Sequence, residues 1–110
     1  MDFTVTDNPA AEQFEIAVDG KQAGLAAYRR KPGIIAFIHT EIYPEFGGQG
    51  LGGKLISSAL NTVGAEGLDV LPFCPFVNKY IAEHDEYLRL VPEAMRDQFG
   101  LPASAEEPVA

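Results

Sequence analysis

The sequence predicts a mixed α/β (α+β) fold, in which an antiparallel meander of four strands is followed by a helix, a fifth strand and another helix. Three observations predict it. Strand-like runs near the start of the chain are separated by turn residues such as Asp19-Gly20. A glycine-rich stretch joins an apolar run, 34–42, to an amphipathic run, 51–63. A short apolar run, 68–71, follows that helix, so the crossover rule makes it parallel to 34–42.

Alternating side chains and turn residues place the four strands of the meander. They are residues 3–6, 13–18, 22–30 and 34–42, with turns at Asn8-Pro9, Asp19-Gly20 and Lys31-Pro32-Gly33. The run 34–42 is apolar on both faces for most of its length, which predicts a central strand. Period-two alternation puts His39 and Glu41 on the face of Ile35 and Phe37. A polar pair there indicates that this face opens toward a cleft near the end of the strand.

The second half of the chain combines helices with one short strand. Apolar residues of 51–63 recur at helical spacing and form one stripe with two flanking positions: Leu51, Leu55, Ala59 and Val63, beside Ile56 and Leu60. Pro72 and Pro75 then interrupt the pattern. Residues 76–83 predict a helix that turns three side chains inward: Phe76, Tyr80 and Ile81.

Residues 1–99 are expected to form a single domain, because a chain of 110 residues can bury one core without disulfides. Within it, residues 92–99 predict a last short helix. From Gly100 the chain is rich in Ala, Pro and Glu, so 100–110 is expected to be a flexible C-terminal tail.

The charge and cysteine content narrow the class of protein. A net charge of −8 argues against nucleic-acid or anionic-membrane binding, since phosphate contacts need clustered Lys and Arg. The only cysteine, Cys74, excludes an internal disulfide and fits a reducing cytoplasm. The start of the chain lacks a signal-peptide pattern, and no apolar run approaches the ~20 residues that span a bilayer. We therefore expect a cytoplasmic protein without nucleic-acid or membrane partners; its oligomeric state stays open.

A glycine-rich stretch carries the strongest functional signal: Gly47-Gly48-Gln49-Gly50-Leu51-Gly52-Gly53-Lys54. A glycine turn between a strand and a helix aims unpaired backbone N–H groups at an anion, and the helix start adds partial positive charge. Between Glu45 and Glu66 the only charged residue is Lys54. We therefore expect a phosphate cradle; the alternative is a flexible turn before an ordinary helix.

Cys74 lies between Pro72 and Pro75, just past the second of the parallel strands. The start of the following helix would stabilise a thiolate, so this thiol is a candidate nucleophile that carries an acyl group or positions a thioester. The alternative is a small buried hydrophobic residue, since unpaired cysteines are often buried.

His39 and Tyr80 are the other candidates for catalysis. His39 lies in a strand and is either a general base near neutral pH or a structural histidine. Tyr80 either donates a proton to a leaving group or packs in the core with its hydroxyl satisfied. His84 is expected at a helix end. The three residues His39, His84 and Cys74 lack the spacing of a metal site, so no metal is expected.

The glycine stretch, with the strand before it and the helix after it, resembles the acetyl-CoA-binding motif of the GCN5-related N-acetyltransferases. That motif runs Arg/Gln-x-x-Gly-x-Gly/Ala and corresponds here to Gly47, Gly50 and Gly52, with Pro44-Glu45 before it. Gly47 stands where the family has Arg or Gln.

Further short motifs are similar to a subfamily of small single-domain proteins, the YjdJ-type N-acetyltransferases. This resemblance covers about residues 12–91 and includes His39-Thr40-Glu41, Gly48-Gln49-Gly50, Pro72-x-Cys74, Tyr80-Ile81 and His84-x-Glu86-Tyr87. It implies a truncated acyl-CoA N-acyltransferase fold, in which a parallel pair of central strands is splayed around coenzyme A.

The resemblance also implies roles for particular residues. The implied coenzyme A-binding residues are Ile42, Gly47, Gly48, Gln49, Gly50, Leu51, Gly52, Gly53 and Lys54. The pyrophosphate would rest on the backbone of 48–53, and the thioester would point toward Cys74 and His39. Larger relatives often use a strand Glu as base and a helix Tyr as acid. Tyr80 matches the second role by position, whereas Ala36 stands in place of the Glu.

We therefore predict an acetyl-CoA-dependent N-acetyltransferase whose acceptor is a small-molecule or peptide amine. The acetyl group would pass directly or through Cys74. An acidic protein favours a cationic acceptor, such as a polyamine or a Lys-bearing peptide. The alternative is a noncatalytic module with the same fold, which binds coenzyme A or another protein.

Overall fold

The computed structural model describes residues 2–103, and its five strands form one sheet in the order β1-β2-β3-β4-β5. The strands are β1 (Phe3–Asn8), β2 (Gln13–Val18), β3 (Lys21–Lys31), β4 (Ile34–Ile42) and β5 (Asp69–Pro72). Strands β1 to β4 pair antiparallel in sequence order, and β4 pairs parallel with β5. The predicted meander and the predicted parallel pair are both confirmed.

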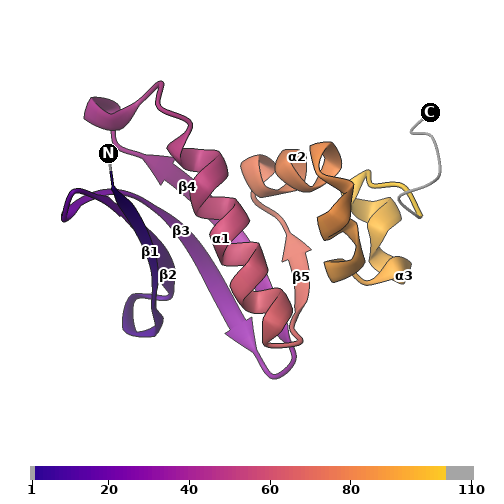
Figure 1. Cartoon of the computed structure of the whole chain (residues 1–110). Coiled ribbons are helices and arrows are strands. Elements are labelled where there is room, and N and C mark those ends of the chain that lie inside the picture. The colour runs from indigo at the N-terminus through magenta and orange to yellow at the C-terminus, as the bar shows by residue number, and fades with distance from the viewer. Residues whose placement is uncertain (1, 104–110) are drawn as a thin grey trace.

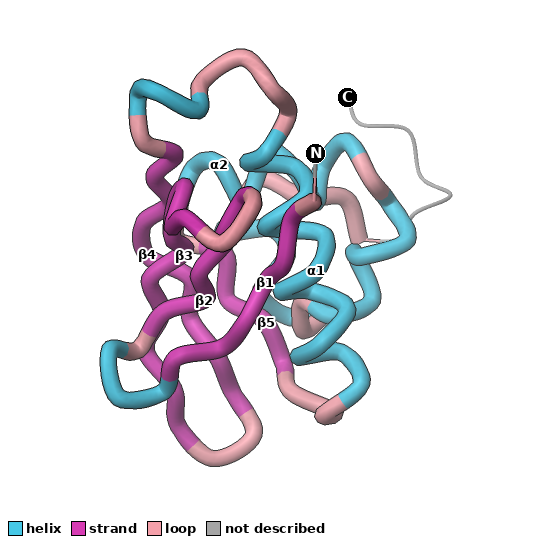
Figure 2. The backbone as a smooth tube through the Cα atoms, turned by 60° about the vertical axis from the view of Figure 1, so that its left-hand side comes forward, coloured by secondary structure: helices cyan, strands magenta, loops and turns pink. Residues whose placement is uncertain are grey.

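Three α-helices accompany the sheet: α1 (Leu51–Ala65), α2 (Pro75–Glu83) and α3 (Glu93–Arg96). Figure 1 shows α1 crossing one face of the sheet, with α2 and α3 gathered beside β5. In the turned view of Figure 2, the strands lie on one side of the molecule and α1 on the other. The predicted helix 92–99 is divided into α3 and a 3₁₀ turn, Asp97–Phe99. The longest 3₁₀ segment of the described residues, Asp85–Leu90, was not predicted.

The core lies between α1 and one face of the sheet. The whole predicted stripe of α1 is buried there, together with Ile56 and Leu60. Three aromatic rings, Phe14, Tyr28 and Phe37, fill the sheet side of this core, with centroids 5.6 to 6.4 Å apart. The opposite face of the sheet has no buried side chain among the described strand residues. We call it the open face.

Strand β4 contains a bulge that reverses the alternation of its side chains. Tyr28 pairs with Phe37, but the next residue, Ala27, pairs with His39, so Ile38 is an extra residue in β4. Because one extra residue moves every later side chain to the other face, His39 and Glu41 lie on the open face, opposite Phe37. The predicted shared face was therefore wrong.

Two predictions about the C-terminal half also need correction. Phe76 does not turn inward; it is 44% exposed, and Val77 and Ile81 supply the buried positions of α2. The predicted tail, 100–110, begins with a packed residue, since Leu101 is buried and its N–H donates to the Arg96 carbonyl oxygen. Residues 104–110 lie outside the described residues.

Replacing Tyr28 with Phe tests a polar contact at the edge of the core. The Tyr28 hydroxyl donates to Asp7 Oδ1 at 2.6 Å, and burial together with this carboxylate raises the pKa of Tyr28 to about 12. Since the folded pKa lies above the ordinary value of 10, this tyrosine stabilises the fold fully below pH 10 and loses that contribution toward pH 12. Tyr28→Phe should cost ~1 kcal/mol at pH 7.

The measurement is the free energy of unfolding in urea between pH 7 and pH 12. The variant should lose less stability than the parent protein over the alkaline part of this range. Tyr43→Phe is the matched control, because the Tyr43 hydroxyl accepts only an exposed hydrogen bond from Gln22. Equal alkaline losses in all three proteins would contradict the assignment.

Candidate functional site

The glycine-rich stretch divides into an exposed loop and a packed first helical turn. Gly47, Gly48, Gln49 and Gly50 are exposed, and Gly48 and Gly50 have φ angles of +79° and +71°. These left-handed conformations favour glycine, and nothing lies within 4 Å of where a Cβ would stand at either position. The loop backbone is therefore open to an approaching ligand.

The start of α1 has backbone N–H groups without a side-chain cap, which can bind an anion. Gly50 is its N-cap, no side chain caps it, and its first turn contains no acidic residue. The first N–H groups of a helix have no partner within the helix, and they carry a partial positive charge. The one basic residue of α1, Lys54, is exposed and holds its ammonium 5.0 Å from the centre of the Phe3 ring.

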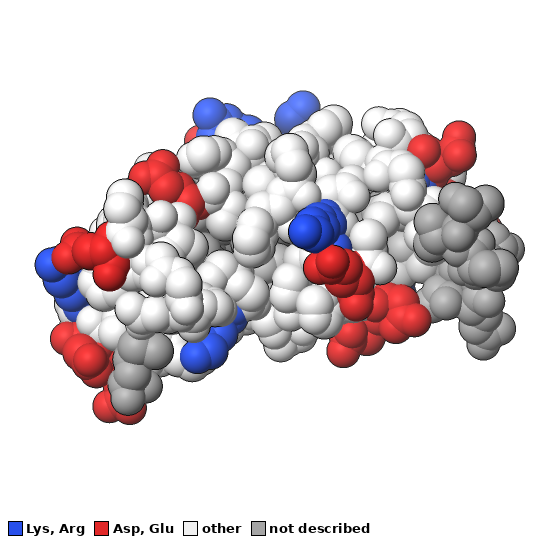
Figure 3. Space-filling view, turned by 90° about the horizontal axis from the view of Figure 1, so that it is seen from above, with Lys and Arg blue, Asp and Glu red and all other residues white. Residues whose placement is uncertain are grey.

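The next glycines serve packing as well. A Cβ on Gly52 would stand 2.6 Å from Cζ of Phe76, and one on Gly53 would stand 3.7 Å from Tyr80. Both contacts come from α2, so small residues let the two helices approach. Leu51, predicted with the cofactor-binding residues, has its side chain in the core. Figure 3 views this end of the molecule and shows a surface that is largely uncharged across its middle.

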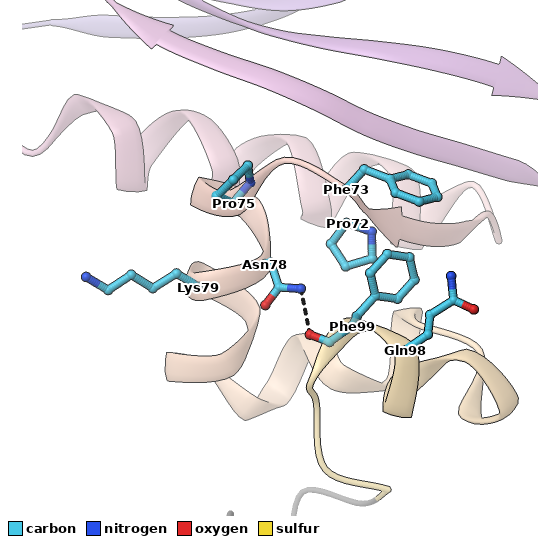
Figure 4. A pocket seen from close by; sticks show the side chains of 7 residues that line it. All are labelled: Pro72, Phe73, Pro75, Asn78, Lys79, Gln98 and Phe99. Carbon is cyan, nitrogen blue, oxygen red and sulfur yellow. Dashed lines mark hydrogen bonds between the residues drawn. The ribbon is translucent and has the colours of Figure 1, made fainter.

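The two parallel strands separate beside this loop. Their ladder ends at the pair Phe37 and Pro72, and the Cys74 N–H then donates to the Phe37 carbonyl oxygen at 2.8 Å. Beyond that point β4 continues to Ile42, whereas the chain after β5 turns away through Phe73 and Pro75 into α2 (Figure 4). Within the described residues, the last part of β4 thus has no strand partner on this side. Ile42, a predicted cofactor-binding residue, is half-buried at the end of this segment.

The candidate catalytic residues lie around the opening but do not converge on one point. Cys74 is buried as the N-cap residue of α2, and its Sγ lies 3.3 Å from Thr40 Oγ1. His39 lies on the open face, 61% exposed, with Nε2 3.3 Å from Glu41 Oε1. In the described part of the chain, no hydrogen bond joins His39 to Cys74.

Tyr80 lies apart from this pair, on α2. Its ring is half-buried and stacks on His84 at 3.9 Å between centroids. The His84 ring is held in turn by Nδ1, which lies 2.8 Å from the Tyr80 carbonyl oxygen. His84 therefore lies at the end of α2, as the sequence predicted, and its ring is held against Tyr80.

Sequence reasoning named Thr40 only as part of the motif His39-Thr40-Glu41 and missed its contact with the Cys74 thiol. Regular alternation hid it, because only the bulge at Ile38 turns Thr40 toward the helices. The described residues hold no group of three or more His, Cys, Asp or Glu side chains that could bind a metal ion. Across residues 2–103, no helix has the length and apolarity needed to cross a membrane.

A sheet whose parallel pair opens beside the start of a glycine-led helix defines the acyl-CoA N-acyltransferase fold. The family comparison agrees, since residues 13–90 match the model described as GCN5-related N-acetyl-transferase. The chain therefore belongs to the GCN5-related N-acetyltransferase family. The narrower YjdJ-type assignment stays a prediction.

One of the solved structures that resemble this chain shows the same fold. A GCN5-like protein from Staphylococcus aureus, described as a proposed N-acetyltransferase, has a TM-score of 0.62 and 22% identity, over 81% of this chain and 87% of that one. N-acetylglutamate synthase from Neisseria gonorrhoeae, solved with coenzyme A and N-acetyl-glutamate, has a TM-score of 0.48 and 17% identity, over 56% of this chain and 15% of that one. The search of curated proteins found no match.

Proposed function

We propose that this protein transfers the acetyl group of acetyl-CoA to an amine. The observation that carries the proposal is the separation of β4 from β5 directly after Phe37 and Pro72, beside the uncapped start of α1. An opening between strands accepts a thin arm such as pantetheine, and an uncapped helix start accepts a phosphate. Membership of the family supports the same donor.

The residues present fit coenzyme A. The pyrophosphate would be held by backbone N–H groups from Gly48 to Gly53, where the loop is open and the first turn of α1 contains no acid. Ile42 would line the path of the pantetheine arm at the end of β4. Phe76, whose ring end lies over Gly52, would border the same path from α2. The bound molecule supplies an activated acetyl thioester, and the chain's own residues orient it and move protons.

The open face would receive the amine. An acceptor ammonium first gives a proton to His39, which Glu41 holds at 3.3 Å. The amine nitrogen then attacks the thioester carbonyl carbon, so a C–N bond forms and the C–S bond breaks. The nitrogen releases its second proton to solvent, which reaches the exposed open face, and the departing thiolate gains one proton. Tyr80 is our candidate for supplying that proton, on the α2 side of the opening.

The direct test is acetyl-CoA titration by calorimetry, followed by measurement of free coenzyme A thiol with a panel of amines. Binding together with amine-dependent thiol release supports the proposal. Binding without release for every amine would instead favour the noncatalytic module.

Replacing Cys74 with Ala tests whether the acetyl group passes through the thiol. Cys74 is 3% exposed and contacts Thr40, a setting that suits packing better than attack. We therefore expect direct transfer, with turnover in Cys74→Ala within about tenfold of the parent. Intact-mass measurement after incubation with acetyl-CoA should show no acetyl adduct.

Thr40→Val is the matched control, because it removes the contact with Sγ and keeps the thiol. An acetyl adduct on Cys74 that disappears when an amine is added would contradict direct transfer.

A further inference from the structure

The open face of the sheet contains a pocket of ≈ 380 Å³ next to the opening. Six residues line it: Arg29, Lys31, Ile34, Ala36, Leu71 and Phe73. The strand register explains why they meet. Ala36 pairs with Arg29 on one side and with Leu71 on the other, so one row of side chains crosses three strands. The apolar side chains form the base of the pocket, and the two cations, Arg29 and Lys31, lie on its β3 side.

The two cations of this pocket have no ion pair with any described acid. Among residues 2–103, the Arg29 side chain donates only to the neighbouring Tyr28 carbonyl oxygen, at 3.0 Å. Asp69, the register partner of Ile34, lies on the same face but pairs with neither cation. In a chain with 16 acidic and 8 basic residues, two unpaired cations over an apolar floor favour an apolar anion.

The pocket and the proposed transfer centre lie on the same face of the sheet, at successive positions along β4. Ala36 and Leu71 form the ladder pair just before the last one, Phe37 and Pro72. His39 lies farther along β4 on the same open face, opposite Ala27. Arg29 is two residues and Lys31 four residues from Ala27 along β3. The two cations therefore lie ~7 Å and ~14 Å from the level of His39, measured along the strand.

We propose that this pocket holds the acceptor, and that the acceptor is an apolar molecule with an amine at one end and a carboxylate about 7–14 Å away. This inference rests on the proposed acetyl transfer. The amine lies at His39 and Glu41, the apolar body covers Ala36 and Leu71, and the carboxylate binds Arg29 and Lys31. The acidic composition predicted a cationic acceptor, whereas the local charges select one with a carboxylate.

The first test measures binding without turnover. Hexanoate and hexylamine are titrated into the coenzyme A-loaded protein while backbone amide NMR shifts are recorded. Hexanoate should move the amides of Ala36, Leu71 and Phe73, and hexylamine should move them far less. Arg29→Gln should weaken hexanoate binding about tenfold, since a charged hydrogen bond is lost. Arg89→Gln, an exposed cation of the 3₁₀ segment Asp85–Leu90, is the matched control and should leave binding unchanged.

The second test measures transfer. The kcat/KM for 6-aminohexanoate should exceed that for hexylamine by about tenfold or more. Arg29→Gln should remove this preference by raising KM for 6-aminohexanoate, whereas the control Arg89→Gln should leave the kcat/KM of both amines unchanged. Ala36→Ile, which fills the floor with a strand-favouring side chain, should lower kcat/KM for 6-aminohexanoate with both cations in place.

Each outcome decides a separate point. No hexanoate-dependent shift in these residues, or equal loss of binding in Arg29→Gln and Arg89→Gln, would overturn the pocket. Hexanoate binding with no preference for 6-aminohexanoate would overturn its role as the acceptor site. If coenzyme A and hexanoate both bind but no amine is acetylated, the proposed transfer fails and the acceptor assignment fails with it, while the anion pocket stands.

Discussion

Gly50→Glu is expected to weaken acetyl-CoA binding by about a hundredfold, or ~2.7 kcal/mol. Gly50 caps α1 with a φ of +71°, at the point where the first N–H groups of the helix face the open loop. A carboxylate there competes with the pyrophosphate for these groups and repels it. Calorimetric titration measures the loss.

Gly67→Glu is the matched control for backbone strain and charge. Gly67 also has a positive φ, +76°, has nothing within 4 Å of its Cβ position and follows the other end of α1. A glutamate is less favourable there than at Gly50, because a helix C-terminus carries partial negative charge. If Gly67→Glu binds acetyl-CoA normally, lost stability cannot explain a defect in Gly50→Glu. Normal affinity in a folded Gly50→Glu protein would rule out the cradle.

His39→Ala is expected to lower acetyl transfer by ~10²–10⁴-fold, the usual contribution of a general base. The loss should appear in kcat, with acetyl-CoA affinity nearly unchanged, because His39 lies on the open face and away from the loop and α1. Its exposed ring is held by Glu41 rather than by packing, so the change should leave folding intact. Steady-state kinetics with a working acceptor, together with calorimetry, separate the two effects.

His84→Ala serves as the comparison, since the other histidine of the chain is bound to the Tyr80 carbonyl oxygen and stacked on its ring. It should affect stability more than the chemical step. Glu41→Gln should show a smaller loss of kcat than His39→Ala, because it removes only the group that orients the ring. Unchanged turnover in His39→Ala would make His39 a surface residue without a catalytic role.

Local patterns were sufficient to predict most of the fold. Hairpin turns, one amphipathic helix and a strand reached through that helix determine the order of the sheet and the parallel pair. The glycine loop was equally readable as a turn between a strand and a helix, because glycine favours the positive φ angles found at Gly48 and Gly50. Its role in binding an anion stays a prediction. These signals depend on neighbours in sequence, so they need no knowledge of tertiary contacts.

Other features depend on contacts that no local pattern reports. The bulge at Ile38 depends on how β3 and β4 pair, so the face of His39 was predicted wrongly and the contact of Thr40 with the Cys74 thiol was missed. Phe76 looked like a core residue, yet Gly52 on α1 gives its ring a place at the surface of the helix pair. The pocket on the open face joins residues from three strands, so its charge differed from what the overall composition indicated.

The open face has a further consequence for the proposed transfer. Because no described helix covers that side of the sheet, the proposed reaction centre is open to solvent there. Bulky acceptors can extend outward without steric exclusion, including groups attached to a much larger molecule. The same exposure admits water, so selectivity has to come from anchoring the acceptor rather than from enclosing it, and slow loss of acetyl groups to hydrolysis is the expected accompaniment.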